Sequence, residues 1–273
     1  MKIPVYYLDA FTNTVFKGNP IAVCPLEEIL PENLMQNIAT EINFSETAFV
    51  WNKNFDFTNS DKFNLKWFAP SSEVSLCGHG TLGTSSILFN TFKNKNANIT
   101  FNTLSGDLLA HKDNQTIWLN LPKYDFEKFS VNQNILSALG IKNVKNSVIS
   151  KSSQTILIEL ENIDEINPDF SKLKAIKEEY LGAIIITQKG YNQYDFISRY
   201  FTPWYGINED PVTGSAHSLL ANYWNKILAK NQMLAYQSSQ RGGEIKINLD
   251  HNFPDRVFIG GETVLVLKGE LFL

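Results

Sequence analysis

The sequence predicts a mixed α/β (α+β) chain made of two similar halves, and three observations lead to this prediction. Its 273 residues suit two modest domains better than one small core. Strand-like and helix-like patterns are interspersed along the whole chain. Short motifs recur in the same order in both halves. We therefore expect two lobes, 1–121 and 122–262, packed directly on one another without a low-complexity linker.

Composition limits the classes of protein that this chain can belong to. Hydrophobic residues make up 43% and charged residues 19%, which is typical of a globular chain that forms a core. The net charge is −4 and basic clusters are short, so we expect no nucleic-acid or anionic-membrane partner. No apolar run reaches the length of a membrane span, and Asp9 comes too early for a secretory signal. Two cysteines, Cys24 and Cys77, indicate a reducing, cytoplasmic setting.

In the first half, Pro31 supports a helix start, because proline suits the first helical position. The patterns predict, in order, strands over 2–11 and 21–26, a helix over 31–42, strands over 43–50 and 62–70, a loop running into a helix over 71–92, and strands over 98–103, 107–113 and 116–122.

The second half is expected to repeat this alternation. It contains helices within 125–140 and over 172–180, strands over 182–188 and 194–201, a loop over 203–214, a helix over 215–233, and strands over 234–240, 243–249, 256–261 and 263–273. An apolar stripe marks the helix from 215, formed by Leu219, Leu220, Tyr223, Trp224, Ile227 and Leu228.

A short internal repeat supports the duplication. Residues 67–70 read Trp-Phe-Ala-Pro, and residues 200–203 read Tyr-Phe-Thr-Pro. Glu73 and Glu209 each lie five residues before a glycine that opens a small-residue turn into a helix. A repeated order of strand, proline, glutamate, glycine and helix predicts two helix N-termini on one cleft.

The two glycine turns, 77–83 and 210–217, are candidates for binding an anion. Glycine lets the backbone approach a ligand closely, and the first N–H groups of a helix favour a carboxylate. Thr213 and Ser215 are both able to cap the second helix. The alternative is that both segments are ordinary tight turns with N-caps; their occurrence in matching halves favours a shared anion site.

His79 and Asp210 are the polar candidates within these turns. His79 sits inside a glycine turn, where little core surrounds it, so we expect a role in binding or proton transfer. Asp210 is expected to orient a substrate amine or hydroxyl, or to hold His79 in one tautomer. The alternative for Asp210 and its neighbour Glu209 is a pair of solvated carboxylates that cap the helix.

Glu46 lies in the segment Asn-Phe-Ser-Glu-Thr-Ala-Phe-Val, residues 43–50. On a strand it would share one face with Phe44, Ala48 and Val50. Apolar surroundings raise the pKa of a carboxyl toward neutrality, where it both takes and gives protons. A buried glutamate paired with a lysine or arginine for structure remains the alternative.

Cys77 is a candidate for thiol-based catalysis. A thiol before a helix N-terminus can have a lowered pKa and act as a nucleophile, paired with His79 or His217. A two-thiol racemase needs a second cysteine in the matching turn, which holds Thr213 near that position instead. Cys-x-His alone does not make a metal site, so we expect no metal.

Long ordered motifs across almost the whole chain resemble the PhzF family of phenazine-biosynthesis isomerases and, more distantly, diaminopimelate epimerase. They are Asp9–Val23 (DAFTNTVFKGNPIAV), Asn43–Val50 (NFSETAFV), Leu65–Gly83 (LKWFAPSSEVSLCGHGTLG), Arg199–His217 (RYFTPWYGINEDPVTGSAH) and Ala235–Ile245 (AYQSSQRGGEI).

The resemblance implies a diaminopimelate epimerase-like fold of two pseudo-symmetric domains. Each would be a mostly antiparallel sheet wrapped around a central helix, with the active site in the cleft between them. The C-terminal strand, 263–273, would return to the first lobe. Members of the family need no metal or organic cofactor, and they commonly form homodimers.

The resemblance also implies roles for single residues. The glutamate of the family's Ser-Glu-Thr motif is the acid–base catalyst, which is Glu46 here. The proposed catalytic set is Glu46, His79 and Asp210, and the proposed substrate-binding set is Gly78, Gly80, Gly214, Ser215 and Asn19. Of the paired cysteines of diaminopimelate epimerase, this chain has Cys77 alone.

We therefore expect a cofactor-independent isomerase that moves a proton within a small cyclic or amino carboxylic acid. Two other classes stay open at this point. One is a Cys77-dependent epimerase or hydrolase, and the other is a catalytically silent carboxylate-binding protein.

Overall fold

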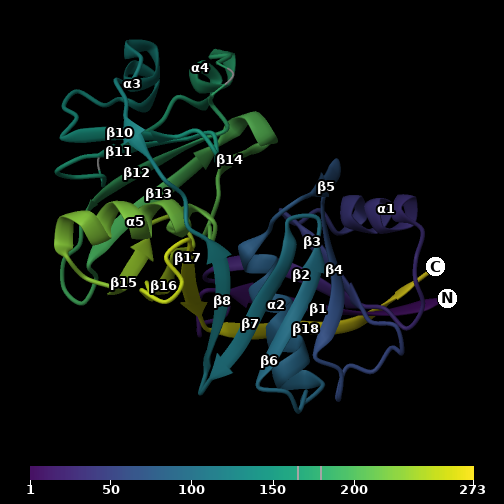
Figure 1. Cartoon of the computed structure of the whole chain (residues 1–273). Helices are drawn as coiled ribbons and strands as arrows, with labels where there is room; N and C mark the ends of the chain where they lie inside the picture. The colour runs from purple at the N-terminus through teal and green to yellow at the C-terminus, as the bar shows by residue number, and fades with distance from the viewer. Residues whose placement is uncertain (165, 179) are drawn as a thin grey trace. The chain divides into compact units, whose positions relative to one another are not determined.

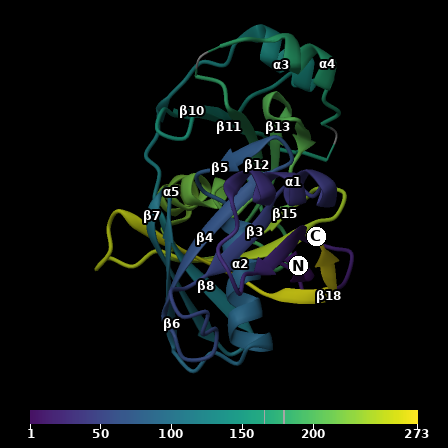
Figure 2. The same ribbon diagram turned by 90° about the vertical axis from the view of Figure 1, so that its right-hand side faces the viewer.

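The computed structural model describes residues 1–164, 166–178 and 180–273, which divide into two compact units (Figures 1 and 2). Unit 1 comprises Met1–Leu121 and Phe258–Leu273, and unit 2 comprises Pro122–Val257. Each holds its own sheet and helices, so the mixed α+β fold predicted from the sequence is confirmed. Among the described residues, no helix is both long and apolar enough to cross a bilayer.

The strands of unit 1 form one sheet in the order β18, β1, β2, β3, β4, β6, β7, β8. The pairs β2–β3 and β4–β6 are parallel, and the other pairs are antiparallel. The bounds are β1 (Lys2–Ala10), β2 (Asn19–Pro25), β3 (Thr47–Trp51), β4 (Lys62–Ala69), β5 (Ser72–Val74), β6 (Asn98–Thr103), β7 (Gly106–Asp113), β8 (Thr116–Pro122), β17 (Arg256–Gly261) and β18 (Thr263–Phe272).

The end of the chain closes this strand order. β17 pairs with β8 at one end of the order, and β18 pairs with β1 at the other. Only Glu262 separates β17 from β18, so the sheet curls back on itself. Residues 258–262 therefore belong to unit 1 and not to the second lobe, where we had expected them. The two termini lie side by side (Figure 2), and the Met1 amino group donates to the Leu273 carbonyl.

Inside this curled sheet lies α2 (Gly78–Ser86), a helix whose nine residues are all buried (Figure 1). Its small side chains explain how strands pack so close to it. A Cβ added at Gly80 would lie 2.6 Å from Trp67 Cδ1, and one at Gly83 would lie 2.6 Å from Ile21 Cγ2. The hydroxyls of Thr81, Thr84 and Ser85 each donate to the carbonyl four residues earlier, which allows a polar helix to be buried. A π-helical turn, Ile87–Thr91, follows.

The helix α1 (Glu32–Ile42) sets the approach of the chain to β3. Pro31 precedes it at the N-cap, and Met35, Ile38 and Ala39 are buried. Asn43 ends the helix with a φ of 56°, the left-handed conformation that asparagine tolerates. The chain turns there and begins β3 at Thr47, so the strand starts later than the predicted 43–50.

Unit 2 forms a sheet in the order β9, β10, β11, β12, β13, β15, β16, with β11–β12 and β13–β15 parallel. The bounds are β9 (Glu127–Lys128), β10 (Asn146–Ser150), β11 (Thr155–Glu159), β12 (Ala183–Lys189), β13 (Phe196–Thr202), β14 (Ile207–Glu209), β15 (Gln232–Gln237) and β16 (Gly243–Asn248). The helices are α3 (Gln133–Leu139), α4 (Phe170–Ala175), a 3-10 turn (Pro203–Tyr205) and α5 (Ala216–Leu228).

Two helices of unit 2 are shorter than predicted. The helix expected over 172–180 is α4, which ends at Ala175; Glu179 lies outside the described residues. The helix expected over 215–233 is α5, which ends at Leu228 because Ala229 adopts a left-handed φ of 52°. Its first two turns are buried, whereas Ile227, placed on the apolar stripe, is exposed.

The internal repeat is a repeat of structure. In both units the sheet runs antiparallel, parallel, antiparallel, parallel, antiparallel, from β1 to β7 and from β10 to β16. Glu73 faces Phe68 across β5–β4, and Glu209 faces Phe201 across β14–β13.

Each repeated glutamate also holds a cation on the neighbouring strand. Glu73 pairs with Lys66 at 3.3 Å, and Glu209 pairs with Arg199 at 2.8 Å. Both pairs brace the hairpin that leads into the buried helix of their unit. They are structural counterparts, and the cation was not foreseen from the sequence motif.

Replacing Gly80 by alanine is expected to destabilise the protein, because the new methyl would overlap the rigid, buried Trp67 ring and the Cys77 sulfur. Overpacking costs about 1–3 kcal/mol, and the better helix propensity of alanine returns about 1 kcal/mol. Urea unfolding monitored by circular dichroism measures the difference. The control is Gly269→Ala, whose Cβ would make ordinary contacts at 3.6 Å; equal stabilities for the two variants would contradict this account.

Candidate active site

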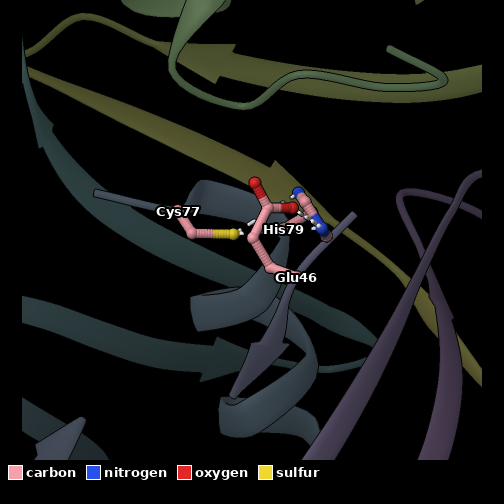
Figure 3. A group of neighbouring side chains, drawn as sticks. All are labelled: Glu46, Cys77 and His79. Carbon is pink, nitrogen blue, oxygen red and sulfur yellow. Dashed lines mark hydrogen bonds and ion pairs between the residues drawn. The ribbon is translucent and has the colours of Figure 1, made fainter. Parts of the chain in front are cut away.

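Three chemically active side chains of unit 1 come together at the start of α2. One ligand atom from each of Glu46, Cys77 and His79 lies within 4.8 Å of the others (Figure 3). Glu46 is supplied by the turn before β3, Cys77 is the N-cap residue of α2, and His79 lies in its first turn. The parallel pairing of β2 with β3, over which α2 packs, brings the turn and the helix start to one place.

Glu46 and His79 form the central contact. Glu46 Oε2 lies 3.2 Å from His79 Nε2, and the side chains are 18% and 6% exposed. Ser45 Oγ lies 3.3 Å from the same His79 nitrogen. Glu46 thus keeps limited access to solvent while its partner is buried, which is the arrangement that an acid–base group needs.

The predicted rise in the pKa of Glu46 is wrong. Burial does raise the pKa of this carboxyl, but the charge of His79 and hydrogen bonds from His79 and Ser45 outweigh it, so the net pKa is lowered. Glu46 also precedes β3 and is not on an apolar strand face. The pattern around Glu46 showed its apolar neighbours but not a histidine that comes much later in the chain.

His79 shows the opposite balance. Burial lowers the pKa of its imidazole, but Cys77 and the Glu46 carboxylate favour the charged form, and the net pKa lies well above 6.5. The Glu46 carboxylate is the neighbour that carries a charge at neutral pH, because the Cys77 thiol keeps its proton there. His79 and Glu46 are therefore an imidazolium and a carboxylate at neutral pH.

Cys77 is buried and its pKa is raised, whereas the sequence analysis considered a lowered pKa for this thiol. Burial raises its pKa more than His79 and the Gly80 N–H lower it. Its Sγ accepts a hydrogen bond from the Gly80 N–H at 3.3 Å and lies 3.6 Å from His79 Nδ1. Cys24, the other cysteine, lies on β2 with its side chain fully buried in the core, and burial raises its pKa to about 12.

Asn19 reaches this group through a strained turn. Gly18 has a φ of 64°, and a Cβ there would lie 2.1 Å from the Ala10 carbonyl oxygen, so only glycine fits. The turn places the Asn19 amide nitrogen 3.3 Å from His79 Nδ1 in a fully buried position. Asn19 therefore contacts the imidazole, as a member of the group. Ser45, which also contacts the imidazole, was not among the predicted site residues. Ser45 stands next to Glu46 in the same motif, which was the signal for it.

The second turn is organised within unit 2. Thr213 Oγ1 donates to the Asp210 carboxylate, and Ser215 is the N-cap of α5 without a side-chain hydrogen bond. Ser215 therefore occupies the N-cap position, but neither its side chain nor that of Thr213 makes a capping hydrogen bond to the helix. Gly214 lies between them at the helix start.

A glutamine that the sequence analysis missed braces this turn. Gln237 is fully buried, donates to the Asp210 carbonyl at 2.7 Å and accepts from the Thr213 N–H at 2.9 Å. Ser239 donates to the Pro211 carbonyl at 2.7 Å. Both belong to the Ala235–Ile245 motif, which was noted for the resemblance but given no role.

His217 and Glu209 have structural roles. His217 Nδ1 lies 2.8 Å from the Thr213 carbonyl, its ring stacks on Phe196, and burial lowers its pKa to about 4. It is therefore neutral at pH 7 and fixed inside unit 2. Glu209 is paired with Arg199, so neither residue is a solvated helix cap or a thiol partner.

The predicted site residues thus fall into two groups. Unit 1 brings together Glu46, His79 and Asn19 with Gly78 and Gly80 of α2. Unit 2 holds the other group, Asp210, Gly214 and Ser215. Each group is described within its own unit, and the contact of Asp210 with His79 stays a prediction.

Comparison with known proteins identifies the family of this chain. The model of the PhzC-PhzF family, described as phenazine biosynthesis-like protein, matches residues 8–269. Phenazine biosynthesis-like domain-containing protein 1 of Mus musculus is 43% identical, with 99% of both chains covered. An uncharacterized isomerase of Halalkalibacterium halodurans is also 43% identical over 100% of both chains.

Among solved structures, a PhzF-family phenazine biosynthesis protein from Enterococcus faecalis superposes with a TM-score of 0.90 at 39% identity, covering 100% of both chains. The names of these relatives support an isomerase or epimerase kind of function. With a family model that spans nearly all of the sequence and a matching fold, the chain belongs to the PhzC-PhzF family of phenazine biosynthesis-like proteins.

Proposed function

We propose that this protein is an isomerase that moves a proton between two carbon atoms of a small carboxylic acid, with Glu46 as the acid–base. The contact between Glu46 and His79 carries the proposal. It holds a carboxylate and an imidazolium together in a largely buried position, with the carboxylate on the more accessible side. No atom is added or lost in such a reaction, so two protein groups that exchange a proton with the substrate are sufficient.

The balance of effects on Glu46 suggests how its basicity is switched. In the free protein, His79 keeps the carboxylate ionised against the opposing effect of burial. When the negative group of a substrate draws the charge of His79, the carboxylate loses that support. Burial then raises its pKa, and Glu46 takes a proton from a carbon made acidic by conjugation. Glu46 then gives this proton to the second carbon and becomes a carboxylate again.

The start of α2 supplies the anchor for the negative end of the substrate. The helix has nine residues and begins at Gly78, and the side chain of His79 in its first turn contacts the Glu46 carboxylate. The unpaired N–H groups of a first turn favour an anion. Asn19 and Ser45, which both face the imidazole, hold its ring in place while the charge moves. The second group, around Asp210, is expected to hold the remaining polar atoms of the substrate.

Replacing Glu46 by glutamine tests this role. Turnover is expected to fall about 10²–10⁴-fold, the usual contribution of a general acid–base, while ligand affinity stays within about tenfold, or 1.4 kcal/mol. The measurement is deuterium incorporation from D₂O into a panel of small cyclic and amino carboxylic acids, followed by mass spectrometry. Glu41→Gln, the same change on an exposed turn of α1, is the matched control. Unchanged exchange in Glu46→Gln would exclude Glu46 as the catalyst.

The pKa of His79 offers a second test that needs no substrate. NMR titration of the wild type is expected to give a pKa above 6.5 for this histidine, assigned with His79→Asn. In Glu46→Gln the pKa should fall, because burial still opposes the charge and the carboxylate no longer supports it. The imidazolium is then lost at a lower pH than in the wild type. A pKa that does not move would show that the pair is not coupled in solution.

A thiol-based epimerase is the second candidate, favoured by the 3.6 Å contact between Cys77 Sγ and His79 Nδ1. Against it stand the raised pKa of the thiol and the threonine in the matching turn of unit 2. We expect Cys77→Ser to keep proton exchange within about tenfold of the wild type. Loss of exchange in Cys77→Ser together with its persistence in Glu46→Gln would favour the thiol.

A further inference from the structure

The cluster at the start of α2 has the composition and spacing of a metal site. Cys77 and His79, two residues apart in the sequence, provide two ligands, and the fold brings Glu46 close to them as a third. A thiolate, an imidazole and a carboxylate are the ligands that Zn²⁺ takes in catalytic sites, where a fourth position stays open. All three side chains come from rigid positions: the N-cap and first turn of a buried helix, and the residue before a buried strand.

The two distances from His79 Nε2 to the other ligand atoms are close to those around one ion. With Zn–N and Zn–O bonds of about 2.0 Å and a Zn–S bond of about 2.3 Å, a tetrahedral site separates N from O by about 3.3 Å and N from S by about 3.6 Å. Glu46 Oε2 lies 3.2 Å from His79 Nε2, and Cys77 Sγ lies 3.9 Å from the same nitrogen. The Glu46 oxygen and the Cys77 sulfur lie within 4.8 Å of each other, against about 3.5 Å in a tetrahedral site, so the two side chains would close in by up to about 1 Å on binding.

Charge and surroundings also fit a divalent cation. The Cys77 thiolate and the Glu46 carboxylate together carry two negative charges, which Zn²⁺ would neutralise in this largely buried place. The Gly80 N–H already points at the sulfur, and the Asn19 amide faces His79 Nδ1. Such outer contacts orient metal ligands, and an amide is able to present either its nitrogen or its oxygen to the ring.

We propose that Glu46, Cys77 and His79 form a binding site for Zn²⁺, and that the bound ion inhibits the enzyme. Binding displaces the proton of the Cys77 thiol and the Nε2 proton of His79, and both protons leave to solvent. Three bonds form, from Sγ, from Nε2 and from one Glu46 oxygen. Inhibition rests on the proposed function, because the ion would occupy the two groups that transfer the proton; the binding site itself does not depend on it.

Metal binding is tested directly, without turnover. Purified full-length protein, stripped with a chelator, is titrated with Co²⁺ as a spectroscopic probe and with Zn²⁺ in equilibrium dialysis. We expect one ion per chain, a thiolate-to-Co²⁺ charge-transfer band in the near ultraviolet, and displacement of Co²⁺ by Zn²⁺. Loss of an outer contact alone costs a site 10–100-fold in affinity, so Cys77→Ser should lose about 100-fold or more together with the band.

The chain offers a matched control for the cysteine change. Cys24→Ser removes the other buried thiol, which lies on β2 in a separate part of the core, and should bind Co²⁺ as the wild type does. Glu46→Gln should also weaken binding while keeping the charge-transfer band at saturating Co²⁺, because the sulfur remains. Circular dichroism of each variant establishes that it is folded.

Three results would overturn the metal site: no charge-transfer band in the wild type, equal affinity in Cys77→Ser, or loss of binding in Cys24→Ser with Cys77 intact. Failure of the proposed function has a different signature, which is deuterium exchange that survives in Glu46→Gln. If Zn²⁺ binds at one ion per chain but deuterium exchange continues at saturation, the site stands and the inhibition is wrong.

Discussion

The contact between Glu46 and His79 is the interaction on which the candidate site depends. Burial opposes the charge of both groups. His79 keeps Glu46 ionised, and Cys77 together with Glu46 favours the charged form of His79. The penalty for burying an ion is several kcal/mol, and unit charges 4 Å apart at an effective dielectric of about 20 attract by about 4 kcal/mol. These terms are of similar size, so the pair stands near balance. A modest change in the surroundings, such as an arriving anion, is enough to move a proton.

The scaffold holds this pair through α2, a helix that is fully buried although most of its side chains are small or polar. In α2, glycine, serine and threonine stand where buried helices usually have large apolar residues. Three of the hydroxyls donate hydrogen bonds to carbonyls of the preceding turn. Without bulky side chains, β2 and β4 approach the helix closely, and Trp67 packs against Gly80. The imidazole itself is held by side chains, among them Asn19, Ser45 and Glu46. Rigidity at the helix start keeps His79 within 3.2 Å of a residue from another part of the chain.

How much the sequence predicted depends on the range of the interaction. Most of the elements, the duplication and a helix within 71–92 follow from local patterns, which the sequence displays directly. The strands β10 and β11 were not predicted, although they form part of the sheet of unit 2. The direction of the Glu46 pKa does not follow from local patterns, because it is set by a histidine that only the fold brings near. Gln237 was missed for the same reason: nothing local marks an amide that braces a turn far earlier in the chain. His217 looked like a thiol partner, yet the fold buries it inside unit 2.

The duplicated architecture separates the part of each unit that is conserved between the repeats from the part that has diverged. Both units keep the pairing order of the strands and a partly buried glutamate that holds a cation on the neighbouring strand. The turns that follow carry different chemistry: Cys77 accepts the helix N–H and touches an imidazole, whereas Thr213 donates its hydroxyl to a carboxylate. The first turn is suited to moving a proton and to accepting a metal ion, whereas the second pairs a hydroxyl with a carboxylate and holds its histidine, His217, against a backbone carbonyl. Because the bracing ion pairs lie outside both turns, either turn can change its chemistry without loss of the hairpin that supports it.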